Sequence, residues 1–228
     1  MHQPRWQRRK DARPAEILTA ALDIFAERGY AAAKLDEVAA RAGVSKGTLY
    51  LYFESKEELF RSMVRGLLLP NLAAAERRIA ESTGQVSDLL RGIIATLGHA
   101  VSQTKLGAIP KLIIAESANF PDLAKFYHEE VISRGMRLMD GLIKRGVETG
   151  EFRPIAPEQI LPIVVGPILV LSVWKHGFEP AGVPPLPTAA VLANHVEFLL
   201  RALAPDGGAA KATAGRASRK EARHERKS

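Results

Sequence analysis

The sequence of 228 residues contains no cysteine. This absence excludes a disulfide framework, a thiolate zinc site and a cysteine nucleophile. The sequence also has no uncharged apolar run of the roughly 18–20 residues that a membrane-spanning helix needs. Its longest run, 160–174, is shorter and is interrupted by Pro162, Gly166 and Pro167. Because no apolar segment follows the basic N-terminus, no signal peptide is expected. We therefore expect a soluble cytoplasmic protein without a membrane partner.

Recognisable catalytic motifs are missing as well. The segment GVSKGT does not have the GxxxxGK[ST] spacing of a phosphate-binding loop, and no GxGxxG follows a strand pattern. The GxSxG spacing at residues 43–47 is not preceded by a strand pattern, which the nucleophile elbow of a hydrolase requires. His128 and Glu129 lack the second histidine of HExxH, and no two of the six histidines are four residues apart. We expect neither an enzyme nor a cofactor nor a metal site, with a metal site assembled from distant residues as the alternative to the last of these.

Apolar residues recur at helical spacing almost throughout, and no alternating pattern typical of strands is present. The sequence therefore predicts an all-α fold of about nine helices, three short ones near the N-terminus and then longer ones. Pro14 is expected in the first turn of the first helix, and Gly29 at its end. The predicted helices cover residues 14–29, 35–42, 46–53, 55–67, 86–101, 106–119, 121–150, 157–178 and 187–203.

Positive charge is concentrated at the two ends of the chain. Residues 1–13 and 205–228 each carry a net charge of +4, within a total of +7 for the whole sequence. Arms of this kind suit a polyanion such as DNA or an anionic membrane surface. The alternative is that they are disordered, solvated tails that only favour solubility, and we expect this of the C-terminal tail.

The segment LDEVAARAGVSKGTLYLYFESKEELF, residues 35–60, is the most informative part of the sequence. Two short predicted helices joined by a tight turn at Gly43 are the architecture of a helix-turn-helix, whose second helix enters the major groove of DNA. At about 100° per residue, Leu49 and Phe53 face the first of these helices and Val44. The outward face then carries Lys46, Gly47, Tyr50 and Leu51.

This segment, preceded by LTAALDIFAERGY at residues 18–30, resembles the DNA-binding domain of the tetracycline-repressor (TetR) family of transcriptional regulators. The segment IIAESANFPDL is similar to the region between the sixth and seventh helices of many members. The resemblance implies an N-terminal helix-turn-helix domain of three helices and a larger helical domain that binds a ligand and dimerises. The expected organisation is a basic arm at 1–12, the DNA-binding domain at 13–60, the ligand-binding and dimerisation domain at 61–204, and a basic tail at 205–228.

Transferred to this sequence, the resemblance places base-edge contacts at the start of the second helix of the motif and phosphate contacts around it. Tyrosine hydroxyls and an ammonium group at a helix start suit phosphates, and Lys46 can donate to guanine. Two positions depart from the family: Lys34 replaces a capping Thr or Ser, and Leu51 replaces a polar residue. Alternatives are that Tyr50 and Tyr52 only pack and that Lys56 is merely solvated. The expected DNA-binding residues are Lys34, Ser45, Lys46, Gly47, Thr48, Tyr50, Tyr52 and Lys56.

Four residues of the second domain are candidates for a ligand pocket, because each places a polar or aromatic group on an apolar helix face. Arg134 would bind an anionic ligand, unless it pairs with Glu130 four residues away. Glu116 would bind a cationic one, unless it is exposed or caps a helix. Phe120 and Trp174 would line the pocket, unless they are core residues.

The sequence thus predicts a homodimeric transcriptional regulator, a repressor released from a palindromic DNA operator by an unknown small-molecule effector. Dimerisation is expected through the last two helices, because the helix at 157–178 is too apolar to pack on one side only. The alternative is an architectural protein that binds DNA without sequence specificity and without a ligand. A ligand-binding scaffold without a DNA function would require the GVSKGTLYLYF run to be coincidental.

Overall fold

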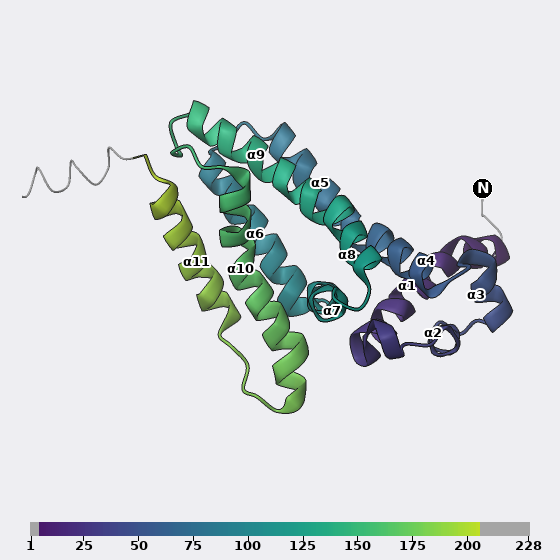
Figure 1. Ribbon diagram of the computed structural model, residues 1–228. Coiled ribbons are helices and arrows are strands. Elements are labelled where there is room, and N and C mark those ends of the chain that lie inside the picture. Colours follow the sequence, from purple (N-terminus) through teal and green to yellow (C-terminus); the bar gives the residue numbers. More distant parts are fainter. Residues whose placement is uncertain (1–4, 206–228) are drawn as a thin grey trace, which may run out of the picture.

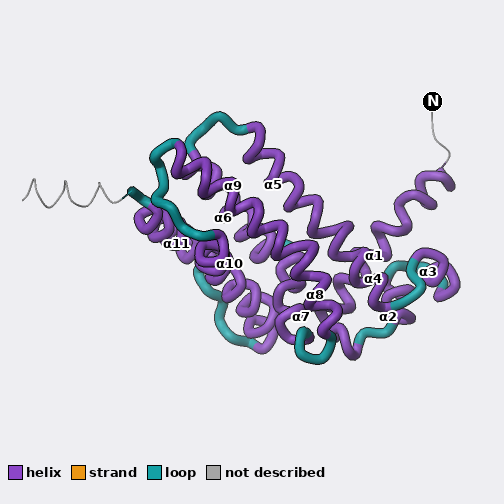
Figure 2. The backbone as a smooth tube through the Cα atoms, turned by 45° about the horizontal axis from the view of Figure 1, so that its top comes forward, coloured by secondary structure: helices purple, strands orange, loops and turns teal. Residues whose placement is uncertain are grey.

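The computed structural model describes residues 5–205, with side chains from residue 14 onward, and within this range it is helical and contains no strand (Figure 2). Its α-helices are labelled in Figure 1. They are α1 (Arg5–Ala32), α2 (Leu35–Arg41), α3 (Lys46–Tyr52), α4 (Lys56–Met63), α5 (Leu69–Glu81), α6 (Val86–Gln103), α7 (Ala108–Glu116), α8 (Pro121–Tyr127), α9 (Ser133–Glu148), α10 (Pro157–Val173) and α11 (Thr188–Leu203).

Three π-helical turns connect or extend these helices. Val64–Leu68 joins α4 to α5, His128–Ile132 joins α8 to α9, and Trp174–Phe178 extends α10. Counted as continuous rods, the described residues therefore form nine helices, as the sequence predicted. Single-turn 3₁₀ helices at Lys105–Gly107 and Glu179–Ala181 complete the chain.

The first helix differs from its prediction at one end and agrees with it at the other. It begins at Arg5 instead of near Pro14, which lies inside the helix. Residues 5–13 are mostly polar, so no apolar periodicity marked them as helical. At the other end, Gly29 interrupts the helix with a φ of +78°, a conformation that residues with a Cβ rarely adopt. The predicted end of the helix at Gly29 is thereby confirmed.

The length of helix α10 differs from the expectation drawn from its apolar run. The helical segment from Pro157 to Ala181 has 25 residues and, by length and composition alone, is long and apolar enough to cross a membrane. Pro162 and Pro167 lie inside it without ending it. One side of α10 is buried in the protein, as in a core helix of a globular fold. The buried residues are Ile160, Val164, Ile168, Leu171 and Ser172.

The molecule is elongated, with α1–α4 at one end and α5–α11 forming a helical layer beyond them (Figure 1). We call α1–α4 the head and α5–α11 the body. The body core is built by α6, α9, α10 and α11, with the loop residue Phe152 between them, and includes Leu90, Leu142 and Val164. Burying an apolar side chain of this size contributes roughly 1.5–3 kcal/mol. The body is therefore held together mainly by the packing of these four helices.

The core of the head continues into the body. The apolar cluster that contains the fully buried Phe25, Leu49 and Phe60 also includes side chains of α7 and α8, which contact α1 and α4. These body residues are Ile109, Leu112, Leu123, Phe126 and Tyr127. Because one apolar cluster includes both the head and α7–α8, a movement of α7 or α8 has to be accommodated by the head.

Candidate DNA-binding interface

The helix-turn-helix is formed by α2, a turn at residues 42–45 and α3. Gly43 lies in the turn with a φ of +65°, which explains why a glycine is needed there. Val38 of α2 and Leu49 of α3 are buried, and Phe53 closes the same apolar contact at the end of α3. Val44, in the turn, is half-buried against this cluster. The inner face assigned from the sequence is therefore confirmed.

The opposite face of α3 lies open to solvent. Lys46 and Gly47 are exposed in the first turn, and the exposed fractions of Tyr50 and Leu51 are 43% and 85%. A leucine exposed to this degree contributes nothing to the core. The outer face of α3 thus carries the ammonium of Lys46, the phenol of Tyr50 and the apolar side chain of Leu51. Gly47, which has no side chain, lies beside them.

Hydrogen bonds organise the beginning of α3. The Ser45 hydroxyl oxygen accepts the Thr48 N–H at 3.1 Å and lies 2.8 Å from the Thr48 hydroxyl oxygen. Ser45 is thus the N-cap of α3, as the sequence indicated. The cap uses the Thr48 N–H, so the first-turn amides without this bond are those of the exposed residues Lys46 and Gly47, at a helix N-terminus that favours phosphate.

Lys46 has a partner that the sequence analysis did not identify. Its ammonium lies 2.9 Å and 3.0 Å from the two carboxylate oxygens of Asp36, in the first turn of α2. The hydrogen bond and the charge of Asp36 raise the pKa of Lys46 above its ordinary value. A helical wheel of α2 places Asp36 outward, but only the angle between α2 and α3 shows that it reaches Lys46.

Lys34 and Tyr52 flank this surface. Lys34 occupies the N-cap of α2 and is exposed; its side chain makes no capping hydrogen bond, but its N–H donates to the Glu37 carboxylate at 3.4 Å. Tyr52 is half-buried beside Phe53 and packs against the head core. Both residues remain candidates for phosphate contacts at the edges of α3.

Lys56 is used differently from the expectation. Its ammonium donates to three carbonyl oxygens, those of Tyr30 at 2.8 Å, Ala31 at 2.9 Å and Ala33 at 3.2 Å. It also lies 4.8 Å from the centre of the Tyr30 ring. An ammonium has three hydrogens, so none is left for a phosphate in this structure. Lys56 is neither a free phosphate ligand nor a plain solvated lysine: it caps the end of α1.

Two of the four pocket candidates lie at the contact between body and head. Glu116, at the end of α7, accepts the Ala31 N–H at 3.1 Å. Phe120 packs edge-on against the Tyr30 ring with the centres 4.8 Å apart. Together with Lys56 they hold the segment after the Gly29 kink from both sides. We call Glu116, Phe120 and Lys56 the α1 clasp.

The other two candidates lie elsewhere in the body. Arg134 of α9 forms a fork-like pair with Glu76 of α5 at 2.6 Å and 2.5 Å, and this pairing lowers the pKa of Glu76. The alternative pairing of Arg134 with Glu130 is wrong, because Glu130 instead accepts from Arg65 at 2.6 Å.

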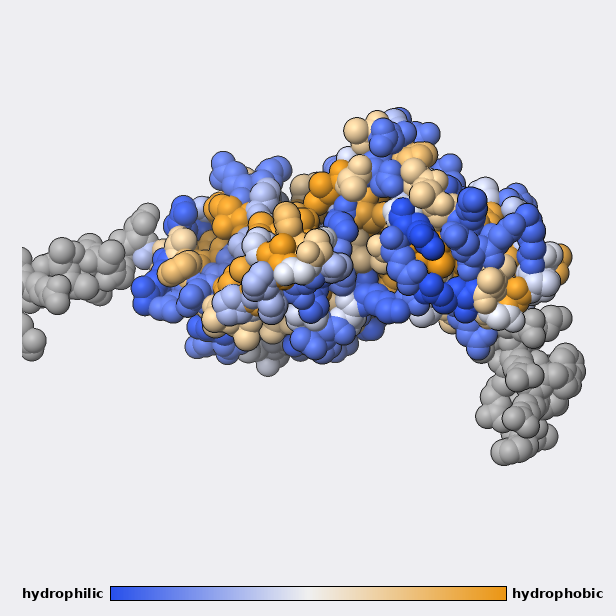
Figure 3. Space-filling view, turned by 90° about the horizontal axis from the view of Figure 1, so that it is seen from below, coloured by the Kyte–Doolittle hydropathy of each residue, from blue (hydrophilic) through white to orange (hydrophobic). Residues whose placement is uncertain are grey.

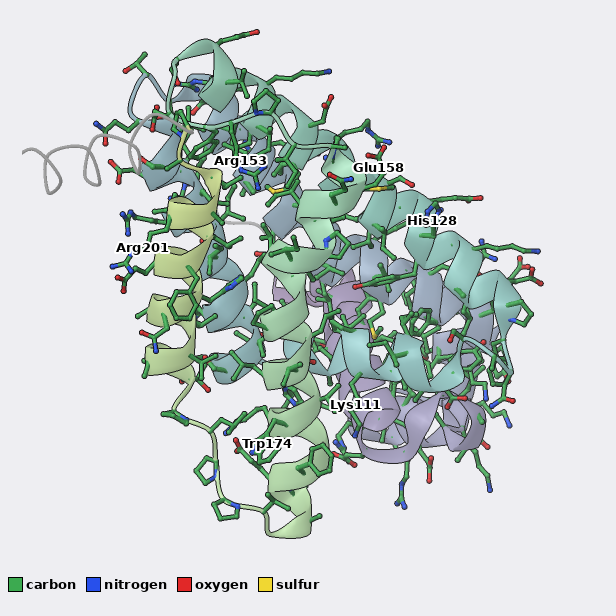
Figure 4. The ribbon with its side chains drawn as sticks, turned by 60° about the vertical axis from the view of Figure 1, so that its left-hand side comes forward. Lys111, His128, Arg153, Glu158, Trp174 and Arg201 are labelled. Carbon is green, nitrogen blue, oxygen red and sulfur yellow. The ribbon has the colours of Figure 1, made fainter. Side chains whose placement is uncertain are left out.

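Trp174 lies near the end of the α10 rod that faces the proline-rich loop (Figure 4), and its indole N–H donates to the Pro184 carbonyl at 2.9 Å. The structure therefore does not bring the four pocket candidates together. Two open surface hollows of about 410 Å³ and 290 Å³, one on α4 and one beside α9, are lined by other residues.

Comparisons with known proteins match both parts of the chain. Residues 17–63 match the model of bacterial regulatory proteins of the tetR family, and residues 80–181 match a tetracyclin repressor-like C-terminal domain. The chain is 30% identical over 145 residues to the HTH-type transcriptional repressor KstR2 of Mycobacterium tuberculosis, covering 63% of this chain and 71% of that protein. The chain belongs to the TetR family.

Further TetR-family relatives agree with this assignment. The fatty acid metabolism regulator protein of Bacillus subtilis is 27% identical over 146 residues, which are 63% of this chain and 74% of that protein. The solved structure of KstR2 of Mycobacterium tuberculosis aligns with a TM-score of 0.65 at 26% identity, covering 85% and 96% of the two chains. FadR from Bacillus subtilis, solved with stearoyl-CoA, has the same fold at a TM-score of 0.66 and 20% identity, covering 83% and 98%.

The two matched segments correspond to the two parts of the fold. The tetR-family segment, 17–63, comprises most of α1 and all of α2, α3 and α4. The C-terminal segment, 80–181, runs from the end of α5 to the end of the α10 rod. This TetR-family chain is accordingly a transcriptional regulator that binds DNA through a helix-turn-helix.

Proposed function

We propose that the chain is a cytoplasmic homodimeric repressor that binds a palindromic operator through α3 and leaves it when a small-molecule effector binds. The observation that carries this proposal is the division of α3 into two faces. Leu49 is fully buried, whereas Lys46 and Tyr50 are exposed on the other side of the same short helix. A helix held in this way can enter the major groove without unfolding any of its packing.

The proposed contacts follow from the chemistry of the exposed groups. Lys46 donates to guanine O6 or N7, the bulk-free Gly47 permits close approach, and Tyr50 contacts a base edge or a phosphate. Leu51 suits a thymine methyl group. Phosphate contacts are assigned to the residues at the start and edges of the motif, namely Lys34, Ser45, Thr48 and Tyr52.

The proposed division of the chain retains a basic arm at 1–12, a DNA-binding domain at 13–60, a ligand-binding and dimerisation domain at 61–204 and a basic tail at 205–228. The head core supports the second of these boundaries only in part, because it includes side chains of α7 and α8. By their position in the sequence, α7 and α8 belong to the body. Their buried side chains, however, pack in the apolar cluster of the head. Residues 1–4 and 206–228 lie outside the described residues.

An effector would reach the operator contacts through this shared packing. Glu116 and Phe120 of the α1 clasp connect the end of α7 to the segment that leads into α2. A ligand that displaces α7 would move that segment and with it α3. Because FadR from Bacillus subtilis was solved with stearoyl-CoA, acyl-CoA thioesters are the first effectors to test.

Dimerisation through α10 and α11 is supported by apolar side chains on their outward faces. Ile163 and Val170 of α10 are 52% and 59% exposed, and Phe198 of α11 is 65% exposed. The two helices lie side by side along one edge of the body (Figures 1 and 4), and apolar surface is visible among the polar side chains of the body (Figure 3). A second copy would remove these side chains from water.

The dimer is tested by sedimentation at micromolar concentration. We expect about twice the 24.8 kDa of the chain for the wild type, and a monomer for the double variant Val170→Glu/Phe198→Glu, because two buried carboxylates per subunit would oppose association. Ile114→Glu, at a residue 56% exposed on α7, is the matched control and should remain dimeric. A monomeric wild type, or a double variant that stays dimeric, would refute this interface.

The function is tested by selecting binding sites from random double-stranded DNA with the full-length protein. Two copies of α3 related by two-fold symmetry should enrich a palindrome whose half-sites are separated by one or more helical turns. The alternative, an architectural protein that binds only phosphates, predicts retention of DNA without an enriched sequence. An absent consensus would therefore contradict the repressor and favour the architectural protein.

A further inference from the structure

The ion pair between Asp36 and Lys46 is unusual in its position. It joins the first turn of α2 to the first turn of α3, at the surface that faces DNA in a helix-turn-helix. A carboxylate here opposes binding, because every phosphate that approaches α3 meets its negative charge. The pair also adds little to the stability of the head, because both side chains are 61% exposed and exposed pairs contribute about 0–1 kcal/mol.

The geometry restricts what Lys46 can do. Its ammonium has three hydrogens, and the carboxylate of Asp36 lies 2.9–3.0 Å from it. A free lysine on a flexible stem can turn to whichever phosphate is nearest, and such a contact carries no sequence information. A lysine held by both oxygens of Asp36 keeps its remaining hydrogen at the outer face of α3, where Tyr50 is also exposed.

We propose that Asp36 is a specificity-determining residue, which acts by penalising complexes in which Lys46 contacts only phosphate. On a matching base pair, guanine O6 or N7 accepts the one ammonium hydrogen that the two Asp36 oxygens leave free, so the carboxylate remains paired with Lys46. On other DNA, Lys46 must leave Asp36 to reach a phosphate, and the carboxylate is then unpaired beside the backbone. Discrimination thus arises from a repulsive element as well as an attractive one.

This inference rests on the proposed contact of Lys46 with a base edge, and its test is designed to separate the two. Equilibrium affinities are measured by fluorescence anisotropy on two duplexes of equal length and composition, the selected consensus and a scrambled sequence, at several salt concentrations. The ratio of the two affinities is the specificity of the full-length protein. Two results would refute the proposed contact and with it this inference. One is a wild type that binds the two duplexes equally tightly. The other is a Lys46→Ala variant whose affinity ratio and selected consensus equal those of the wild type.

Asp36→Asn is the informative variant, because it removes the charge and retains the shape of the side chain. We expect the affinity for the scrambled duplex to rise about tenfold and the affinity for the consensus to rise less than about threefold, so that the ratio falls. In a Lys46→Ala background, Asp36→Asn should leave the ratio unchanged, because the lysine through which it acts is absent.

The matched control is Glu27→Gln. Glu27 pairs with Arg41 of α2 at 2.9 Å, so this variant removes the same charge and also breaks an exposed ion pair, but away from α3. It should change both affinities by the same small factor and leave the ratio intact. Two results would overturn the role of Asp36: an equal rise of both affinities in Asp36→Asn, or a fall of the ratio that persists without Lys46.

Discussion

At the scale of single residues, Lys46 and Lys56 show how differently two lysines of one motif are used. Among the described side chains, the outward-pointing ammonium of Lys46 pairs with Asp36 alone, whereas that of Lys56 points inward and donates to three carbonyl oxygens. Those carbonyls belong to residues 23 to 26 positions earlier in the chain. They are free because helical backbone ends at Ala32, so that no N–H four residues later bonds to them within the helix. A neutral side chain at position 56 would leave the carbonyls unpaired.

Tyr50 is the residue whose removal should cost most at the operator. It is 43% exposed on the outer face of α3 and has no hydrogen-bond partner among the described residues. We expect Tyr50→Ala to lower operator affinity at least tenfold, a loss of about 1.4 kcal/mol or more for the base or phosphate contact that it removes. Fluorescence anisotropy at fixed salt measures this.

Phe178→Ala is the control for the loss of an exposed aromatic ring. Phe178 is 47% exposed beside Trp174, at the end of the α10 rod and far from α3 in sequence. Its removal should leave operator affinity unchanged. If Tyr50→Ala binds the operator as tightly as the wild type, Tyr50 serves packing only, and the outer face of α3 was assigned wrongly.

The sequence predicts which residues of α3 are exposed but not which side chains pair between helices. The faces of α3 followed from helical periodicity, which is a local property, and the exposure of Tyr50 and Leu51 agrees with it. The partners of Asp36, Glu116 and Arg134 did not follow, because each lies on a different helix. Periodicity indicates which side of a helix is buried but gives no crossing angle between helices.

At the scale of the elements, most helix positions were predictable because apolar side chains recur along them. Helix α5 (Leu69–Glu81), which has no buried residue, lies between the helices predicted at 55–67 and 86–101 and was not among the predicted ones. Helix ends were predictable where a residue close in sequence caps the helix. Ser55, for example, accepts the Glu58 N–H at 3.1 Å as the first residue of a capping pattern should. The π-helical turns were not predictable. Such a turn changes the backbone hydrogen-bond pattern from i→i+4 to i→i+5 over a few residues, and the residue types in the turn do not indicate this change. The N-terminus of α6 shows a further case, a cap supplied from a distance.

Glu151 is that distant cap. Its carboxylate accepts the N–H groups of Val86 at 2.9 Å and Ser87 at 3.0 Å, whereas the N-cap residue Gln85 makes no side-chain hydrogen bond. Burial by itself would raise the pKa of Glu151, but the hydrogen bonds from Ser87 and Val86 outweigh it and hold the pKa below the ordinary 4.5. The ionised form is therefore the one that stabilises α6.

We expect Glu151→Gln to lower the free energy of unfolding by about 1 kcal/mol at pH 7, the usual contribution of a helix cap. Because the folded pKa is depressed, this contribution is complete above pH 4.5 and is lost as the pH falls through the lower folded value. Urea unfolding is measured at a series of pH values from 7 down to 4 and below. The difference in the free energy of unfolding between wild type and variant should shrink as the pH falls. Glu148→Gln, at an exposed residue of α9, is the control and should have the same free energy of unfolding as the wild type. If the difference between wild type and Glu151→Gln does not depend on pH, the charge of Glu151 does not have this role.

At the scale of the whole molecule, the two basic ends of the sequence adjoin opposite ends of the elongated protein. The total of +7 comes from the two ends of the sequence, while the intervening chain is close to neutral. The first helix begins at the head and α11 ends at the far end of the body (Figure 1). An N-terminal extension therefore starts near the duplex that α3 would contact, whereas a C-terminal one starts far from it.

Deletion of residues 1–10 should weaken operator binding and flatten its salt dependence without changing the selected sequence. The segment contains four arginine and lysine side chains, and every phosphate that they no longer neutralise reduces the slope of log K against log salt by about 0.9. Deletion of residues 206–228 removes a similar charge and should have almost no effect at physiological salt. If the second deletion abolishes binding and the first does not, the basic ends dominate, as expected of an architectural protein.

The contact between α3 and base edges is tested most directly by repeating the selection from random DNA with Lys46→Ala. Because the ammonium of Lys46 is exposed at the start of α3, its removal should leave the protein folded and still able to bind DNA. The selected palindrome should keep its half-site spacing but lose its preference at one or two base pairs in each half-site, a change of about 1–3 kcal/mol at those positions. A consensus identical to that of the wild type at every position would show that Lys46 contacts only phosphate and would contradict the assignment of the outer face of α3.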